Sequence, residues 1–277
     1  MLMKYQLGLM ALLLGLLGTV QAAPTTAPVQ LQAAVNNPER VEKNRQRDVY
    51  RHPLETLSFF GLRPEMTVLE LWPGGGWYTE ILAPALAQKG QLFVTNFNPE
   101  GPAESYLTRS AKSLNNRLAA RPQVFSKVKV AQITPPTDFN LGPANSVDLV
   151  LTFRNIHNWE MEGYQDKVYA AVYQVLKPGG IFGVEEHRAK PGLTAAPAQV
   201  AKSGYMPEDH VIKSIEAAGF KLVGKSEINS NPKDTKNYPG GVWTLPPTLS
   251  QGDQDRERYL AIGESDRMTL KFIKVNK

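Results

Sequence analysis

The sequence of 277 residues contains no cysteine. Disulfide bonds are therefore excluded, and so is a lipid anchor attached to an N-terminal cysteine. Evidence for export from the cytoplasm must consequently come from the N-terminus alone.

The chain also lacks any stripe or block of charge of one sign. Its 31 Lys and Arg residues are scattered among 26 Asp and Glu residues, and the formal net charge is +5. A nucleic-acid partner is therefore not indicated. Hydrophobic residues make up 42% and charged residues 21% of the chain, as in a globular protein. One domain is the simplest interpretation.

An uncharged, leucine-rich run stands near the N-terminus, over residues 7–20. It follows Lys4 and precedes Ala22 and Ala23, which is the pattern of a secretory signal peptide. The alternative is an uncleaved membrane anchor, but a run of 14 residues is shorter than the roughly 20 that a membrane-spanning helix needs. We therefore predict a signal peptide over residues 1–22, a polar linker over 23–37 and one domain over 38–277. The mature protein is expected to be periplasmic or secreted, without stable membrane insertion.

Apolar segments alternate with helix-favouring segments along the domain. Strands are expected at 67–71, 91–97, within 123–130, and at 147–153, 181–185, 220–226 and 268–275. Helices are expected at 77–88, 106–120, 164–176 and 207–218, with two more before the first strand. Because the strands are apolar nearly throughout, we predict a mostly parallel sheet covered on both faces. The irregular segment 229–254, rich in proline and glycine, is expected to be a functional lid or disordered.

Three glycines, Gly74, Gly75 and Gly76, lie between the first expected strand and the helix after it. Glycines at this place let a ligand approach the backbone, and the helix N-terminus directs N–H donors toward it. The alternative is a tight turn without a ligand. A dinucleotide site would need the spacing G-x-G-x-x-G, but Thr79 stands where the third glycine belongs. A nicotinamide oxidoreductase is therefore disfavoured.

Residues 68–76 (VLELWPGGG) resemble the first motif of class I S-adenosylmethionine-dependent methyltransferases. Residues 176–180 (LKPGG) resemble the turn before the fifth strand of that family, and residues 148–150 (DLV) resemble its fourth strand. The resemblance extends over residues 38–275 and is closest to an exported group of predicted methyltransferases, with similar text at residues 50–53 (YRHP). It implies a three-layer, Rossmann-like α/β fold with seven strands, mostly parallel, and an antiparallel last strand. It also implies S-adenosyl-L-methionine as the cofactor.

The resemblance assigns the cofactor site to the glycine loop and its neighbours. It implies that Glu70 orients the loop and that Gly74 and Gly76, with Gly75 between them, admit the methionine end of the cofactor. The first glycine of the family motif is replaced by Trp72. Asn96 stands where an acid usually binds the ribose hydroxyls, and an amide can also bind them. The alternative is that Asn96 is a plain turn former before Pro99.

Aromatic residues crowd the same loop. Trp72, Trp77 and Tyr78 stand within it or directly after it. A sulfonium cation is attracted to an aromatic face by about 0.5 to 2 kcal/mol. We assign Trp72 and Tyr78 to the cofactor site; the alternative is that these rings belong to the core.

The segment after the strand at 147–153 is the next candidate, because ligands of doubly wound sheets lie beyond the C-terminal ends of the strands. We assign Arg154, Asn155 and His157 to catalysis and Trp159 to acceptor binding. Imidazole is an effective base near neutral pH, so His157 suits removal of a proton from the acceptor. The alternative is a structural histidine. The segment lacks the Asn-Pro-Pro-aromatic signature of enzymes that methylate DNA amino groups, which further disfavours nucleic acid.

Glu186 and His187 follow the strand expected at 181–185. This strand should be a neighbour of the strand that precedes His157, so the two histidines are expected to lie close together. We assign Glu186 and His187 to the acceptor site. A divalent metal between the histidines is an alternative. Hydrogen-bonded or solvated side chains explain the cluster without one, so no metal is predicted.

These observations predict an S-adenosylmethionine-dependent methyltransferase acting on a small molecule or another extracytoplasmic acceptor. The alternative is an exported, methyltransferase-like protein that binds a ligand without transferring a methyl group. Trp72 and Asn96 favour that alternative, and so does the cytoplasmic origin of the cofactor.

Overall fold

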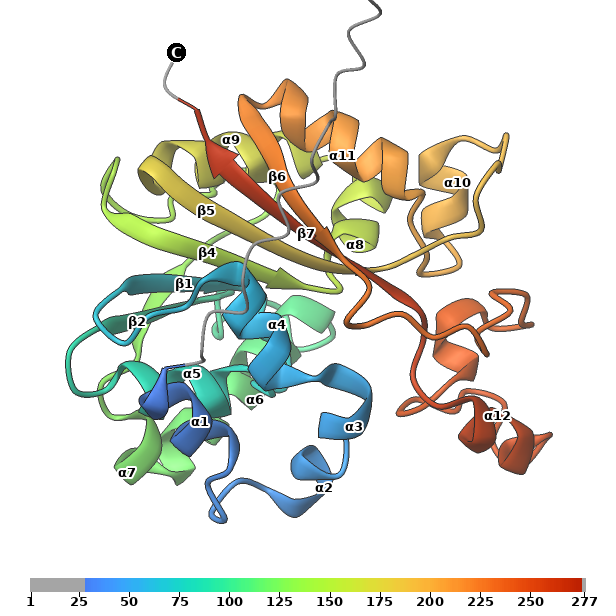
Figure 1. Cartoon of the computed structure of the whole chain (residues 1–277), viewed down its shortest axis with the longest axis horizontal. Helices are drawn as coiled ribbons and strands as arrows, with labels where there is room; N and C mark the ends of the chain where they lie inside the picture. The colour runs from blue at the N-terminus through green and yellow to red at the C-terminus, as the bar shows by residue number, and fades with distance from the viewer. Residues whose placement is uncertain (1–27, 276–277) are drawn as a thin grey trace, which may run out of the picture.

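The computed structural model describes residues 28–275, so the predicted signal peptide and the first part of the predicted linker lie outside the described residues. Its centre is a seven-stranded sheet in the order β3-β2-β1-β4-β5-β7-β6 (Figure 1). The strands are β1 (Thr67–Leu71), β2 (Gln91–Asn96), β3 (Lys129–Gln132), β4 (Val147–Phe153), β5 (Leu176–His187), β6 (Phe220–Ser226) and β7 (Arg267–Lys274). β7 runs antiparallel to β5 and β6, whereas the other neighbours are parallel. The predicted fold class is confirmed.

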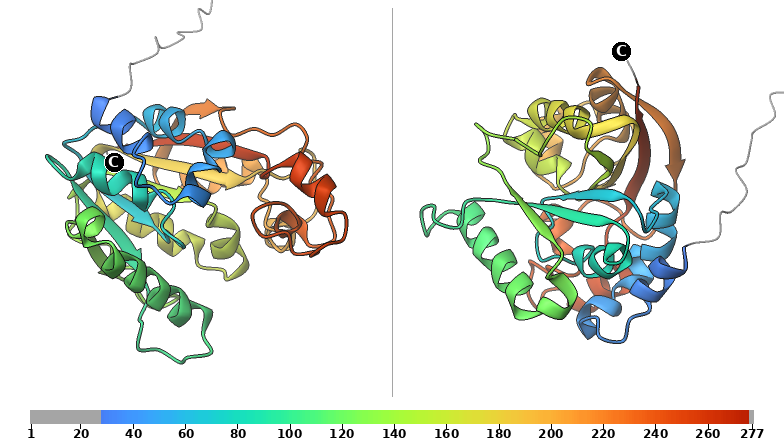
Figure 2. Two further views of the ribbon diagram at one scale, coloured as in Figure 1. Left: turned by 90° about the horizontal axis from the view of Figure 1, so that it is seen from below. Right: turned by 90° about the vertical axis from the view of Figure 1, so that its left-hand side faces the viewer.

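Helices cover both faces of the sheet, which gives three layers (Figures 1 and 2). Leu69 and Leu71 of β1 pack into one core with α8 (Ile156–Met161), α9 (Gln165–Val175) and α11 (Glu208–Ala217). Val68, on the opposite face of the same strand, packs into a second core with α4 (Pro53–Phe60), α5 (Thr79–Leu86) and α7 (Pro122–Phe125). Alternate residues of one strand thus serve two cores, as burial on both faces requires. The helix α6 (Tyr106–Ala120) has the predicted bounds and contributes to both.

The third strand begins later than predicted. A strand was expected within residues 123–130, but that region starts with the helix α7, and β3 follows it. Pro122 occupies the first turn of α7, where the missing N–H of proline is not needed, so a helix begins there.

The predicted turn at residues 177–180 lies inside β5. Pairing between β4 and β5 jumps from Val147–Leu176 to Leu149–Ile181, so the four residues form an irregularity within the strand. Gly179 has a φ of 73° there, which explains the glycine at the turn.

Before β1 the described chain forms four short helices. α1 (Val29–Val35) belongs to the segment predicted as a linker, and it buries Leu31 against α5. α2 (Glu42–Arg45) and α3 (Asp48–Arg51) follow, and the predicted break at His52 and Pro53 separates α3 from α4. Three helices rather than two therefore lie between residues 38 and 61.

The irregular segment 229–254, which we call the lid, is folded against the rest of the molecule. It contains the 3-10 helix η1 (Gly241–Thr244) and is followed by α12 (Arg256–Ile262). Val242 N donates to Ser203 O at 2.8 Å, just after α10 (Pro197–Ala201), and a small apolar cluster surrounds Val242. In Figures 1 and 2 the lid and α12 lie beyond the C-terminal ends of β4 and β5.

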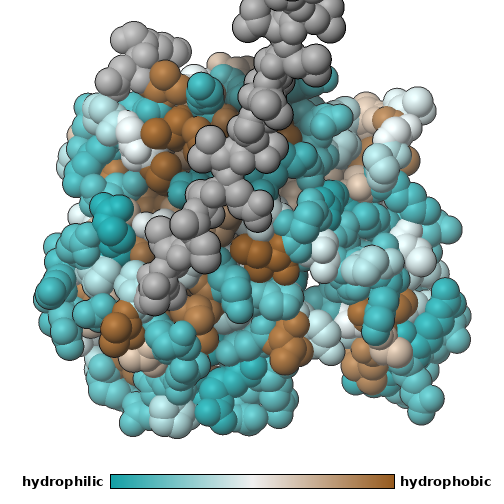
Figure 3. All heavy atoms as spheres, viewed as in Figure 1, coloured by the Kyte–Doolittle hydropathy of each residue, from teal (hydrophilic) through white to brown (hydrophobic). Residues whose placement is uncertain are grey.

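On the face shown in Figure 3, the hydrophobic residues form several separate patches among hydrophilic residues. Within residues 28–275, no helix has the length and apolar character that crossing a membrane requires.

Candidate active site

The loop between β1 and α5 presents its backbone to open space. Trp72, directly after β1, has a φ of 43°, which is uncommon for a residue with a side chain. Gly74 has a φ of 56°, and a Cβ atom added at Gly74 or Gly75 would meet no atom within 4 Å. A ligand can therefore approach the backbone of this loop closely.

Glu70 holds the two sides of the glycine loop together. Its side chain is buried at the end of β1 and accepts a hydrogen bond from Thr79 Oγ1, at the start of α5, at 2.7 Å. Burial raises the pKa of Glu70 to about 7. Glu70 lines neither of the cavities described below, so it positions the loop from behind.

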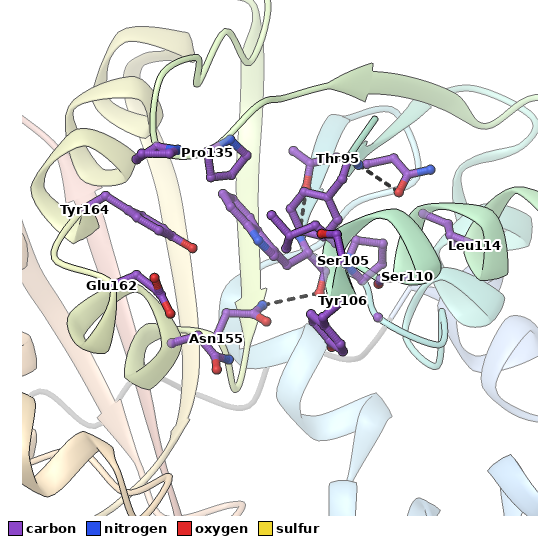
Figure 4. Close-up of a pocket in the computed structure, with 17 residues that line it drawn as sticks. Thr95, Ser105, Tyr106, Ser110, Leu114, Pro135, Asn155, Glu162 and Tyr164 are labelled. Carbon is purple, nitrogen blue, oxygen red and sulfur yellow. Dashed lines mark hydrogen bonds between the residues drawn. The ribbon is translucent and has the colours of Figure 1, made fainter. Parts of the chain in front are cut away.

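A cavity of about 340 Å³, which we call the glycine-loop cavity, opens beside Gly74 (Figure 4). Ser105 and Ser110, at the start of α6, face Glu162 and Tyr164 across it. Glu162 is the one carboxylate in its lining within the described chain. Sequence reasoning did not identify Glu162, because it lies at the C-terminal end of α8, beyond the residues that directly follow β4.

Trp72 forms part of the wall of the glycine-loop cavity. Its backbone N–H donates to Thr95 Oγ1 at 2.7 Å, and its ring centroid lies 5.7 Å from that of Phe97 and 5.1 Å from that of Trp159. The residue that replaces the first glycine of the motif thus joins the loop to the aromatic core and fills space beside the cavity.

Asn96 lines the same cavity, but its amide is bonded within the protein. Nδ2 donates to Ala111 O at 3.2 Å and to Asn115 Oδ1 at 2.8 Å, and Oδ1 accepts from Phe97 N at 2.9 Å. Both donors are therefore directed at α6, and only the second lone pair of Oδ1 remains for a ligand. Its role in ribose binding stays a prediction.

A second cavity, of about 800 Å³, adjoins the first, and Trp72, Gly74 and Asn155 line both. We call it the basic cavity, because its lining includes the cations Lys43, Arg47, Arg51, Arg117 and Arg154. The lid closes one side with Val242 and Trp243, and the helices α2 and α3 close another. Sequence reasoning assigned no chemistry to these N-terminal helices, although Lys43, Arg47 and Arg51 recur every four residues, as on one helical face.

The two predicted site histidines meet in the basic cavity, with ring centroids 5.6 Å apart. His157 Nδ1 lies 3.1 Å from Glu186 Oε1, and the Glu186 carboxylate also accepts from the backbone N–H groups of Ile156 and His187. With Glu186 ionised, Nδ1 of His157 carries the proton, and Nε2 is left as an acceptor. Glu186 does not line the cavity, so it positions His157 rather than contacting an acceptor.

His187 is held by a hydrogen bond to the segment that leads into β7. Its Nδ1 lies 2.6 Å from Ser265 Oγ. Burial, together with repulsion of a second positive charge by its neighbours, among them Arg154, lowers the pKa of His187 well below its usual range. His187 is therefore neutral at neutral pH.

Arg154 and Asn155 lie at the end of β4, as predicted, and both line the basic cavity. Arg154 has a φ of 61°, and its Nη1 donates to Glu185 Oε1 at 2.9 Å. Asn155 Nδ2 donates to Leu71 O and to Thr152 Oγ1, each at 3.1 Å. The amide donors of Asn155 thus tie the end of β1 to the end of β4, which is a positioning role.

Trp159 and Tyr78 require a correction, because the structure places both in the core and in neither cavity. Trp159 is buried under Trp72 by the turn of α8. Tyr78 stacks on Phe153 with a centroid distance of 3.5 Å, and its hydroxyl donates to Glu185 Oε2 at 2.9 Å. Whether Trp159 in α8 and Tyr78 just before α5 are buried depends on the direction in which each side chain points. The sequence alone did not specify that direction.

Metal-binding side chains do not gather at the site: within residues 28–275 no group of three or more His, Asp or Glu side chains is arranged to hold a metal ion. The nearby carboxylates are engaged by hydrogen bonds, as with Glu186, or by arginines, as with Glu264.

No family model matches the chain, and no curated protein matches its sequence. Solved structures share its fold. An S-adenosylmethionine-dependent methyltransferase from Aquifex aeolicus is 17% identical with a TM-score of 0.53, and the match covers 83% of this chain and 93% of that one. The [4+2]-cyclase SpnF is 15% identical with a TM-score of 0.55, covering 84% and 82%. Phosphoethanolamine N-methyltransferase 2 of Haemonchus contortus, in complex with S-adenosyl-L-methionine, is 14% identical with a TM-score of 0.54, covering 82% and 53%. The chain therefore has the fold of S-adenosylmethionine-dependent methyltransferases.

Proposed function

We propose that this chain transfers a methyl group from S-adenosyl-L-methionine to a small-molecule acceptor. The observation that carries the proposal is the arrangement of the two cavities, which meet at Trp72, Gly74 and Asn155. One cavity adjoins an open glycine loop, and the other contains the histidines. Both lie where β1 and β4 end, the place at which ligands of such sheets bind.

The glycine-loop cavity has features that suit this cofactor. The space beside Gly74 and Gly75 would admit its methionine part, and the Trp72 ring offers an aromatic face to a sulfonium cation. The hydroxyls of Ser105 and Ser110 and the carboxylate of Glu162 would supply polar contacts that the occupied amide of Asn96 does not. When bound, S-adenosylmethionine supplies a methyl group that its positive sulfur already activates.

The residues of this chain then have two tasks, to align the acceptor and to take its proton. We assign the second task to His157. His157 Nε2 would take the proton that the acceptor oxygen or nitrogen gives up when it becomes methylated. Glu186, bonded to Nδ1, stabilises the resulting imidazolium. Asn155 holds the two strand ends at a fixed separation.

Calorimetric titration of the purified chain with S-adenosylmethionine and S-adenosylhomocysteine tests the proposal. Gly74→Val is expected to abolish the heat of binding, because a branched side chain fills the open space at a left-handed position. Gly179→Val is the matched control, since Gly179 also has a positive φ and open space but lies at the opposite end of the sheet. A folded sample that gives no heat with either ligand would contradict the proposal.

His157→Ala is expected to keep the heat of binding and to lose methyl transfer. Transfer is measured with methyl-labelled S-adenosylmethionine and a small-molecule extract, and loss of a general base costs about 10² to 10⁴ in rate. If binding falls equally in His157→Ala and Gly74→Val, the catalytic side of the site is misassigned.

A second candidate function is a ligand-binding protein without methyl transfer. The bonded amide of Asn96 and the position of Trp72 favour it, and the cyclase SpnF is named for a different reaction despite the shared fold. Calorimetry separates the two functions, because this candidate predicts no heat with S-adenosylmethionine.

We also propose that the protein is exported, with cleavage after Ala22 or Ala23, on the support of the N-terminal sequence pattern. The mass of the protein recovered from the extracytoplasmic fraction is the test. An intact N-terminus beginning at Met1 would contradict the proposal.

A further inference from the structure

Positive charge exceeds negative charge in the walls of the basic cavity. Five cations line it, and Glu264 is the one carboxylate in its lining within the described chain. Among residues 28–275, Lys43 and Arg117 have no ion pair. The Arg117 side chain lies by the glycine loop, with Cδ 3.1 Å from the place of a Cβ on Gly76.

The ion pairs that the lining arginines form show the same excess of positive charge. Arg51 Nε lies 2.9 Å and Arg47 Nε 2.6 Å from Glu264. Arg154 Nη1 lies 2.9 Å from Glu185, and Arg267 lies between the two carboxylates, 2.8 Å from Glu264 and 3.1 Å from Glu185. Four guanidinium groups therefore share two carboxylates. Tyr78, which donates to Glu185, adds no negative charge because burial raises its pKa well above the usual range.

The arginines also keep donors without acceptors. Arg47 Nη2 is buried and has no hydrogen-bond partner, and within residues 28–275 Arg51 bonds to Glu264 through Nε alone. Burial and the charge of Arg154 lower the pKa of Arg51 to about 9, as expected where cations lack counter-charge. A bound anion would supply both the missing charge and the missing acceptors.

We propose that the acceptor is a small oxyanion, a molecule whose carboxylate or phosphate group is bound by Arg47, Arg51 and Arg154. This inference rests on the proposed function, because the bound molecule is a methyl acceptor only if the chain transfers methyl groups. The anionic group would lie against the arginines while the reacting oxygen or nitrogen lies at His157, which lines the same cavity. Trp243 of the lid, with its ring centroid 5.9 Å from that of His157, would cover the bound molecule.

The carboxylate of the cofactor itself is another source of the same chemistry. Arg117 lies beside Gly76 and lines the same cavity as Gly74 and Gly75, so it is the cation that a cofactor carboxylate would meet. The test must therefore separate an anion bound beside the cofactor from an anion bound in its place.

The unfolding temperature of the chain, measured at constant ionic strength, is the first readout. Succinate and inorganic phosphate are expected to raise it, whereas succinamide, the uncharged analogue of succinate, is not. Arg47→Met is expected to raise about tenfold the succinate concentration that gives half of the maximal rise in unfolding temperature. This is the effect of losing a charge-assisted hydrogen bond. Arg121→Met is the matched control, because Arg121 is 22% exposed and paired with Glu80 outside the cavity, and Arg47 is 23% exposed.

The free chain provides a second readout. Glu264 keeps Arg51 and Arg267 when Arg47 is removed, so Arg47→Met is expected to unfold at the same temperature as the unchanged chain or higher. A merely structural arginine would give the opposite result. Should Arg47→Met not fold, Arg47→Gln, which removes the charge but can still donate a hydrogen bond to Glu264, gives the same comparison.

The third measurement repeats the succinate titration with saturating S-adenosylhomocysteine. The rise is expected to persist if the acceptor is the anion. Its disappearance would assign the arginines to the cofactor carboxylate and overturn the proposal, as would no response to either anion or an equal loss in Arg121→Met. A response to succinate in a chain that gives no heat with S-adenosylhomocysteine would contradict the methyltransferase proposal while leaving the anion site in place.

Discussion

Glu70 is a carboxylate buried at the end of β1 with the Thr79 hydroxyl as its hydrogen-bond donor. The ionised form loses its hydration on folding and gains little in return, which is why its pKa rises to about 7. In the unfolded chain the pKa of the same group stays near its usual value of 4.5. The folded state therefore holds the proton more tightly than the unfolded state.

Stability should consequently fall as pH rises from 4.5 to 7, because the folded chain must give up a proton that the unfolded chain has already lost. A difference of this size corresponds to about 3 kcal/mol. Glu70→Gln removes the charge and can still accept the Thr79 hydrogen bond, so its free energy of unfolding is expected to exceed that of the unchanged chain at pH 8 and to match it at pH 4. Denaturant titration at both pH values measures this.

Glu55→Gln, at an exposed position on α4, controls for the loss of one charge alone. A Glu70→Gln chain that is less stable at pH 8 than the unchanged chain would show that ionised Glu70 is stabilised by a contact other than the one with Thr79.

At this scale the sequence identified residues that follow a strand end. Gly74 comes after β1 and His157 after β4, and adjacent parallel strands end at one edge, so both line cavities there. The direction of the Asn96 amide could not be predicted, because it depends on the packing of α6. Arg47 and Arg51 carried a helical spacing, but their approach to the cavity depends on how α2 and α3 fold over the sheet.

At the scale of elements, the part of the lid around η1 makes a very close contact with the segment after α10. Gly241 has a φ of 57°, and a Cβ there would lie 2.2 Å from Ser203 O, a backbone atom that cannot move freely. The neighbouring Val242 N donates to that same carbonyl. This contact fastens the lid to the segment after α10 close to Trp243 and the basic cavity, and the Tyr205 hydroxyl, which donates to Asp234, fastens it at a second place.

Gly241→Ala is expected to detach this part of the lid. The added methyl group clashes with Ser203 O, which should speed exchange of the Val242 amide hydrogen and lower stability by about 1–3 kcal/mol. Gly252→Ala is the matched control, because Gly252 has a φ of 62° and open space, so it has the backbone strain without the clash. Equal exchange of the Val242 amide in both variants would show that the clash is absorbed elsewhere.

Helix and strand boundaries were predictable where one signal dominated. α6 has the bounds that its composition indicated, whereas α7 replaced part of an expected strand because a proline at the first turn outweighed the apolar residues after it. The contact between the lid and Ser203 joins segments distant in sequence, and no local pattern could reveal it.

At the scale of the whole molecule, the mostly parallel character of the sheet followed from the alternation of strands and helices. Strands that alternate with helices form parallel neighbours through crossover connections, and the apolar strands indicated two covered faces. The antiparallel last strand was predicted from the family resemblance rather than from this rule, and the structure confirms it. The same architecture appears in a methyltransferase and in a cyclase, so the chemistry must be argued from the cavities.

The ion pairs of the basic cavity join the beginning and the end of the described chain. Arg47 and Arg51 meet Glu264 across 217 and 213 residues of sequence. A ribosome therefore completes the glycine loop and His157 well before it adds the carboxylate that holds these two arginines. The wall of the basic cavity can therefore form only late in synthesis, and a chain interrupted before Glu264 would carry the loop and the histidine without a finished wall around them.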